Sequence, residues 1–281
     1  MLAGIVAQPW LAKHNFPTAR WLANSLGVQN GRLLLWLAAL LLLLGFMAVT
    51  GHGTTGRWVG VLIDGRNRLS LSRLQMVTWT IVVLSAYYTA VLWRLTGELT
   101  PTDLAIPQEL WLAIGISVTS LVGTPLILST KTGRVANSSQ ALQTFDLLVT
   151  EGAKAAAQGQ VVTDPRDPSK IAVTRDGKVT VGHRGQLVVK ASPQEADWPD
   201  LFMGEETGNA AQLDLAKVQQ FYFTLIVVIT YGSSLSMMFT GTTLPGTLPA
   251  LAQSLVALLG LSHAGYLVNK VFPHSQGGAA G

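Results

Sequence analysis

The chain of 281 residues is 49% hydrophobic and only 12% charged, about half the charged fraction of an ordinary soluble domain. Its net charge is +4, but the basic residues lie beside apolar segments instead of forming one basic surface, so we expect no nucleic-acid partner. The absence of cysteine excludes disulfide bonds, thiolate nucleophiles and cysteine metal sites.

The first long apolar stretch, residues 33–50, follows an amino-terminal segment of residues 1–32. That segment contains Trp10 and Trp21, and it is too long and too aromatic for the n-region of a cleaved signal peptide. Because residues 33–50 reach only the short end of the spanning range, roughly 17–25 residues, they predict a short but retained anchor helix.

Four later apolar stretches are each long enough to cross a bilayer, which takes about 20 residues of helix. They cover residues 74–95, 108–128, 218–239 and 249–271. Together with the anchor they predict a helical integral membrane protein with five transmembrane helices.

The second and fourth predicted spans share a sequence pattern. Residues 69–87 align without a gap on residues 213–231, with identical polar residues as well as identical apolar ones. A fixed offset of this kind predicts a duplicated unit. We therefore predict two helical-hairpin repeats, residues 51–130 and 198–272, which run in the same sense and are parallel repeats.

Basic residues predict the orientation in the membrane. Arg57 and Arg66 precede the second span and Lys131 follows the third, whereas the short connections 96–107 and 240–248 contain no lysine or arginine. The positive-inside rule then places the amino terminus outside and the carboxyl terminus inside. We expect location in a bacterial cytoplasmic (inner) membrane.

Between the hairpins, residues 131–197 predict a small cytoplasmic insertion, and residues 273–281 a flexible tail. Residues 138–157 carry apolar side chains at helical spacing and predict an amphipathic helix. After the DPRDP sequence at residues 164–168, three alternating runs, IAVT, KVTV and QLVV, are separated by turn residues. They predict a three-stranded β-meander.

The residues that lead into the two repeat helices carry opposite charge. They are Arg66, Arg68 and Arg73 in the first repeat, and Asp200, Glu205 and Glu206 in the second. One interpretation is that these segments face each other and pair, within one chain or across a subunit boundary. The alternative is that the arginines set the topology or contact anionic lipid head groups, and the acids form a solvated loop. Because no regular calcium loop surrounds the acids, we predict no metal site.

The central parts of the predicted spans contain uncharged polar residues but no charged ones, which disfavours a proton pump or an ion-coupled carrier. Candidates to line a pore or to bond between helices are Gln75, Thr80, Gln219, Thr224 and Ser234. Small residues that would let helices pack closely are Gly115, Thr119, Gly123, Gly232 and Ser236. His263 lies at membrane depth, where it would make a helix contact or act in a proton relay.

No phosphate-binding loop, nucleophile elbow, zinc-protease histidine pair or dinucleotide motif occurs, so we expect neither an enzyme nor a cofactor. The first functional hypothesis is a homo-oligomer, or a subunit of a larger membrane complex, that forms a pore for small solutes or ions. The alternative is a membrane anchor or scaffold whose cytoplasmic insertion recruits a partner protein. Both place the chain in a lipid bilayer.

Overall fold

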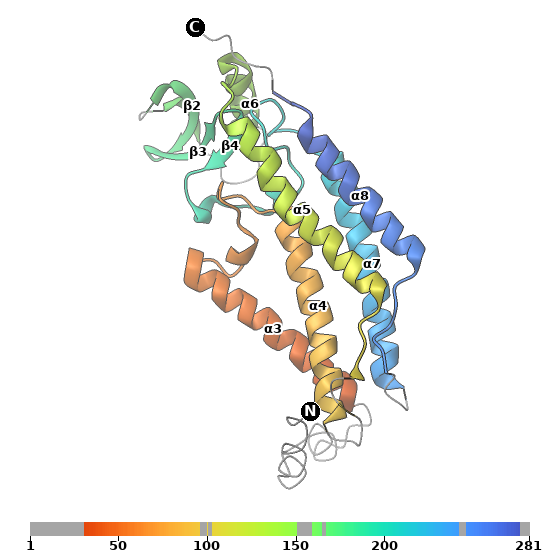
Figure 1. Cartoon of the computed structure of the whole chain (residues 1–281). Helices are drawn as coiled ribbons and strands as arrows, with labels where there is room; N and C mark the ends of the chain where they lie inside the picture. The colour runs from red at the N-terminus through yellow and green to blue at the C-terminus, as the bar shows by residue number, and fades with distance from the viewer. Residues whose placement is uncertain are drawn as a thin grey trace, which may run out of the picture.

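The computed structural model describes residues 31–95, 100, 103–150, 159–164, 167–241 and 246–275. The long helices form one elongated bundle, with a small sheet and one short helix at one end (Figure 1). They are α3 (Gly31–Thr55), α4 (Leu71–Arg94), α5 (Gln108–Thr132), α7 (Leu215–Thr240) and α8 (Gln253–Val271). We call the end that carries the sheet the sheet end and the opposite end the loop end.

Four of the described helices, α3, α4, α5 and α7, are long and apolar enough to cross a membrane. The prediction of a mainly helical chain with several candidate membrane spans and a small antiparallel sheet is therefore confirmed. Helix α8 has 19 residues and is not among the four, because His263, Asn269 and Lys270 lower its hydropathy. The fifth span stays a prediction.

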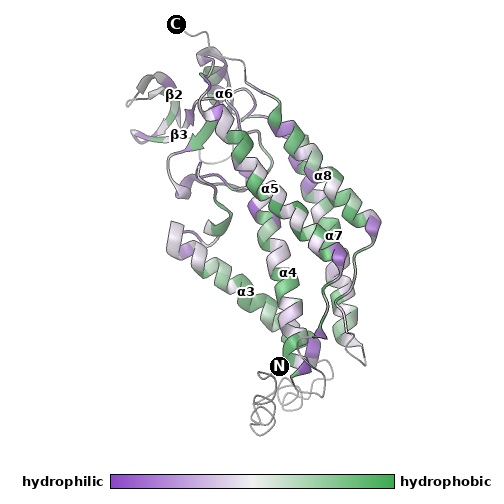
Figure 2. Cartoon of the chain, viewed as in Figure 1, coloured by the Kyte–Doolittle hydropathy of each residue, from purple (hydrophilic) through white to green (hydrophobic). Residues whose placement is uncertain are grey.

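Helix α3 is longer than the predicted 33–50 and is apolar along most of its length (Figure 2). It crosses α4 near the loop end, where Trp36 Nε1 donates a 3.1 Å hydrogen bond to Ser85 Oγ, and it diverges from α4 toward the sheet end (Figure 1). Large apolar side chains such as Leu41, Leu42 and Phe46 are exposed along it. In a bilayer these side chains would contact lipid.

Helices α4 and α5 form one hairpin and α7 and α8 form the other, and both hairpins run from the sheet end to the loop end and back (Figure 1). Helices α4 and α7 begin at Leu71 and Leu215, which are equivalent positions of the aligned sequences. Trp79 and Tyr231 pack between the hairpins with their ring centroids 6.2 Å apart. Both side chains belong to an apolar core that packs between the two hairpins.

At the loop end the two hairpin turns are joined by backbone. Ala105 and Thr247 form a parallel β-bridge. Ala105 donates its N–H to the carbonyl of Gly246 at 3.0 Å, and its own carbonyl accepts from Leu248 at 3.1 Å.

The insertion contains α6 (Ser138–Thr150) and the strands β1 (Gln160–Asp164), β2 (Asp167–Arg175), β3 (Lys178–Arg184) and β4 (Leu187–Lys190). The strands form an antiparallel meander in the order β1-β2-β3-β4. The expected number of three strands is wrong, because residues 160–164 form an additional strand, β1, which pairs with β2. Phe145 of α6 packs with Val173, Val181 and Val188 on one face of the sheet. The predicted end of the amphipathic helix, residues 151–157, lies outside the described residues, as do residues 1–30 and 276–281.

Candidate functional site

The segments that lead into α4 and α7 have the same local structure. We call residues 57–70 and 198–214 the first and second lead-in segments. A short 3-10 helix begins each of them, η1 (Gly60–Leu62) in the first and η4 (Trp198–Leu201) in the second. Each segment then turns back on itself, with β-bridges Ile63–Leu69 and Met203–Leu213.

The same hydrogen bond closes both lead-in segments. Ser70 donates its N–H to the carbonyl of Leu62 at 2.9 Å, and Asp214 donates its N–H to the carbonyl of Phe202 at 2.8 Å. Ser70 and Asp214 are the N-cap residues of α4 and α7, but only the Asp214 side chain accepts bonds from the first turn of its helix. The two segments therefore share the 3-10 helix, the β-bridge and the closing hydrogen bond, and differ in the length of the loop between the bridged residues and in the capping side chain.

Buried ion pairs join the two lead-in segments, the ends of three long helices and the sheet. We call this group the ion-pair cluster; its members are Asp64, Arg66, Arg68, Lys131, Lys190, Asp200, Glu205, Glu206, Lys217 and Lys270. Charges at such depth cost several kcal/mol each unless they are paired and hydrogen-bonded, so the cluster constrains how these elements meet.

Asp200 connects the first lead-in segment to strand β4. Its carboxylate lies 3.2 Å from Arg68 Nε and 2.8 Å from Lys190 Nζ. It also accepts a 2.9 Å bond from the N–H of Asp197. Burial by itself would raise the pKa of Asp200, but the adjacent Arg68 and Lys190 lower it. The carboxylate is therefore held ionised between two cations.

Glu205 has three basic partners. Lys217 Nζ lies at 2.9 Å and Arg66 Nη2 at 3.4 Å, and Lys270 Nζ forms a third ion pair with it. Although burial raises the pKa of a carboxyl group, the three cations hold the pKa of Glu205 well below its usual range. Glu205 thus ties the first lead-in segment to the sheet-end termini of α7 and α8.

Glu206 pairs with Lys131 at the end of α5, at 2.6 Å. Its other oxygen accepts N–H bonds from His274 and Ser275, both at 3.0 Å. Lys131 Nζ also donates to the carbonyls of Lys270 and Phe272. These contacts hold the carboxyl end of α8 against the end of α5.

The structure brings most of the residues of the expected charge pairing together within one chain, although not with all the expected partners. Arg66 faces Glu205 and Arg68 faces Asp200, but Glu206 pairs with Lys131, and Arg73 Nη1 donates to the carbonyl of Val61 at 3.4 Å. We did not expect the four lysines as partners. One of them, Lys131, follows the third predicted span, and we interpreted it only as a topology signal.

Two of the five candidate pore-lining residues, Gln75 and Thr224, are buried and bonded to each other inside the bundle. Gln75 is buried, donates a 2.7 Å bond to Thr224 Oγ1 and accepts a 3.0 Å bond from Gln220 Nε2. The Thr80 hydroxyl bonds within its own helix. Ser234 is half-buried and also bonds within its helix, and Gln219 is exposed on α7. The buried amides therefore link α4 to α7.

The small residues differ in their surroundings. A Cβ at Gly123 would lie 3.4 Å from Leu267, so this glycine is at the contact of α5 with α8. Within the described part of the chain, Gly115 and Gly232 have no neighbouring atom within 4 Å of such a Cβ. Thr119 is exposed and Ser236 is half-buried.

His263 contacts a neighbouring helix. Its Nδ1 lies 2.6 Å from Ser120 Oγ of α5, and its ring is buried. Among the residues with described coordinates, no group of three or more metal-ligating side chains occurs.

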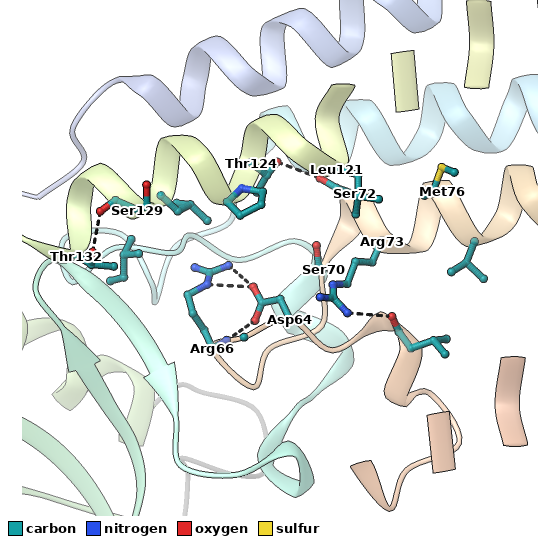
Figure 3. A pocket seen from close by; sticks show the side chains of 16 residues that line it. Asp64, Arg66, Ser70, Ser72, Arg73, Met76, Leu121, Thr124, Ser129 and Thr132 are labelled. Carbon is teal, nitrogen blue, oxygen red and sulfur yellow. Dashed lines mark hydrogen bonds and ion pairs between the residues drawn. The ribbon is translucent and has the colours of Figure 1, made fainter. Parts of the chain in front are cut away.

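A cavity of about 560 Å³ adjoins the cluster between α4, α5 and the first lead-in segment. Figure 3 shows Asp64, Arg66, Ser70 and Arg73 on one side of it and side chains of α5 on the other. Its polar end also includes Ser129 and Thr132 of α5. Its apolar part is lined by Met76, Val77, Leu121, Pro125 and Leu128.

Comparisons of the chain with protein-family models, with curated protein sequences and with solved structures find no match.

Proposed function

We propose that the chain is a membrane anchor whose cytoplasmic insertion is a fixed platform for a partner protein. In this proposal α3, α4, α5, α7 and α8 all span a bacterial inner membrane. The two hairpins are parallel repeats, the sheet end is cytoplasmic, and the amino terminus is outside. The matched starts of α4 and α7 and the matched lead-in segments support the repeats.

The ion-pair cluster carries the proposal. It joins β4 through Lys190, both lead-in segments through Asp200 and Glu205, and the ends of α5, α7 and α8 through their lysines. A flexible tether would leave the insertion free to move relative to the bundle. Here the insertion is held in one orientation by contacts that are costly to break singly, which is what a platform needs.

The exposed tryptophans of the lead-in segments support the placement of the sheet end at a membrane surface. Trp58 is 63% exposed and Trp198 is 58% exposed, although both are large aromatic residues. Tryptophan is enriched at the interface between lipid and water. Two of them at equivalent places would set the depth of the platform.

Strand β1 is the surface at which we place the partner. At the other edge of the sheet, β4 is covered, since Val188 donates to the carbonyl of Glu205 and Lys190 donates to that of Arg66. Strand β1 pairs with β2 on one side, and no other described strand pairs with it. An open edge is a template to which an extended segment of another protein can add as a further strand.

Two neighbouring proline substitutions test this placement. Successive residues of a strand direct their N–H groups to opposite sides, so Val161→Pro and Val162→Pro differ in which edge loses a donor. The variant that loses a donor on the open edge should lose the partner and keep its thermal stability. Partner binding is measured by cross-linking in intact membranes and recovery with the full chain. The variant that loses a donor toward β2 is the matched control. Retention of the partner by both variants, or absence of any stoichiometric partner of the wild type, would contradict the proposal.

A second candidate is a pore between copies of the chain. Gln219, Thr230 and Ser233 are exposed on the outer face of α7, whereas Gln75 and Thr224 are bonded to each other in the interior. A polar path therefore fits the outside of α7 better than the centre of one protomer. Conductance of the purified protein in planar bilayers, reduced by Gln219→Leu, would support it; no conductance in any oligomeric state would remove it.

A further inference from the structure

We infer that the cavity between α4 and α5 binds an anionic phospholipid from the membrane leaflet at the sheet end, with the lipid phosphate on Arg73. The inference requires that the chain lie in a bilayer, but it does not depend on whether the insertion recruits a partner. The volume of the cavity, about 560 Å³, is within the usual range of ligand pockets, about 300–1,000 Å³.

The charge at the polar end of the cavity comes from Arg73. Asp64, the acid in the lining, is already bound by Arg66, with Nε at 3.0 Å and Nη2 at 2.6 Å from Oδ2. Its other oxygen accepts the N–H groups of Arg66 and Arg68. The carboxylate charge of Asp64 is therefore already neutralised by Arg66, and this pair contributes no net charge to the cavity.

Arg73 differs from its counterpart in the second repeat. Lys217, at the aligned position, has a carboxylate partner, Glu205, at 2.9 Å. Arg73 is half-buried, and no carboxylate of the described residues forms an ion pair with it; a backbone carbonyl at 3.4 Å is its hydrogen-bond partner there. Figure 3 shows its guanidinium group beside Ser70 at the cavity. A phosphate would supply the acid that this arginine lacks, with the bidentate geometry that guanidinium groups favour.

Ser70 provides a second polar group at the same place. As the N-cap of α4 it makes no side-chain bond to the helix, and the first turn of α4 contains no acidic residue. Asp214 fulfils that role in α7 by accepting from the N–H groups of Ala216 and Lys217. The hydroxyl of Ser70 and the free donors of α4 are thus available to the anion that Arg73 attracts.

The rest of the lining selects a lipid over a free phosphate. Met76, Val77, Leu121 and Leu128 continue the cavity along two helices that are long and apolar enough to span a membrane. A soluble anion would occupy the polar end and leave these side chains against water, whereas an acyl chain would cover them. Basic pockets between membrane helices at the cytoplasmic surface are suited to anionic head groups.

Three soluble probes test the inference on the purified full-length chain in detergent. They are dioctanoyl phosphatidylglycerol, dioctanoyl phosphatidylcholine and glycerol 3-phosphate, with binding followed by native mass spectrometry and by the shift in thermal unfolding midpoint. We expect saturable binding of the phosphatidylglycerol, weaker binding of the zwitterionic lipid with the same tails, and little effect of glycerol 3-phosphate. Equal binding of the two lipids would overturn the role of charge. Glycerol 3-phosphate binding as tightly as the phosphatidylglycerol would show a site for free phosphates instead.

Two variants locate the site. Arg73→Gln should weaken phosphatidylglycerol binding by about 10- to 100-fold, the ratio expected for loss of a hydrogen bond to a charged group. Arg134→Gln, which changes an exposed arginine at the same end but outside the cavity, should leave the affinity unchanged. Leu121→Trp should reduce binding by filling the apolar part while Arg73 is retained. If Leu121→Trp does not fold, the two arginine variants still test the inference. Equal affinities of Arg73→Gln and Arg134→Gln for phosphatidylglycerol would overturn it.

Discussion

Arg68 and Asp200 form a 3.2 Å ion pair between residues 132 positions apart in the chain, and their side chains are only 4% and 7% exposed. The pair joins the two lead-in segments directly. A buried pair of this kind adds little net stability over an apolar pair, but removal of one partner leaves an unpaired charge out of water.

The first prediction concerns the loss of one charge from that pair. Asp200→Asn leaves Arg68 and Lys190 without their shared carboxylate, so we expect the free energy of unfolding to fall by about 3–5 kcal/mol. Denaturant titration of the purified protein in detergent measures it. Glu195→Gln, which removes the partner of the more exposed Arg175, is the control and should cost at most about 1 kcal/mol. Equal effects of the two substitutions would contradict the structural importance of the cluster.

The second prediction concerns acid. The folded-state pKa values of Asp200 and Glu205 lie below their ordinary values of 3.8 and 4.5. Their contribution to stability is therefore complete above those values, and it is lost as the pH falls from about 4.5 through the lower pKa values of the folded protein. The unfolding midpoint should be nearly constant above pH 5 with respect to these two groups and should drop below pH 4.5. Asp200→Asn should show a shallower drop, and an identical acid profile would count against this explanation.

The third prediction compares two glycines in tight turns of the sheet. Gly185 and Gly177 both have positive φ, at 55° and 73°. A Cβ at Gly185 would lie 2.3 Å from the carbonyl oxygen of Thr132 at the end of α5, whereas a Cβ at Gly177 would meet no described atom within 4 Å. Gly177→Ala should cost about 1 kcal/mol, from backbone strain alone, and Gly185→Ala should cost more because the sheet must move away from α5. Thermal unfolding of the two variants should rank them in that order.

The fourth prediction uses the absence of cysteine from the chain to test the proposed topology. Single cysteines at Thr100 and Ala252, both exposed near the loop end, should react with a membrane-impermeant maleimide added to intact cells. A cysteine at Lys178, exposed on the sheet, or at Phe272, beyond α8, should react only after the cells are opened. Labelling of Ala252 and Phe272 from the same side would show that α8 does not span the membrane.

The starts of the hairpins were predictable from the sequence. Ser70 and Asp214 precede apolar stretches at aligned positions, and α4 and α7 begin one residue after each of them. The local sequence was sufficient to predict where these helices begin, because a polar N-cap and the apolar residues after it act over only a few positions. The meeting of the oppositely charged lead-in segments was also open to prediction, because equivalent positions of a repeat carry complementary charge.

The partners within the cluster could not be predicted in the same way. Lys131 and Lys270 lie at the ends of different helices, and only the packing of α5 against α8 brings both toward the second lead-in segment. Strand β1 was missed because residues 160–164 offer just two apolar side chains, and its place in the sheet depends on pairing with β2. Both features arise from contacts between elements, which no local pattern records.

The β-bridge between Ala105 and Thr247 has a mechanical consequence when it is considered with the contacts at the opposite end. A hairpin that is held at one end can pivot like a lever, and rigid-body rocking of that kind is how many membrane proteins expose a central path to each side in turn. Here the paired hairpins are clamped at both ends, so they behave as a strut. Bending and twisting along their length remain open to them, and pivoting about a free end does not.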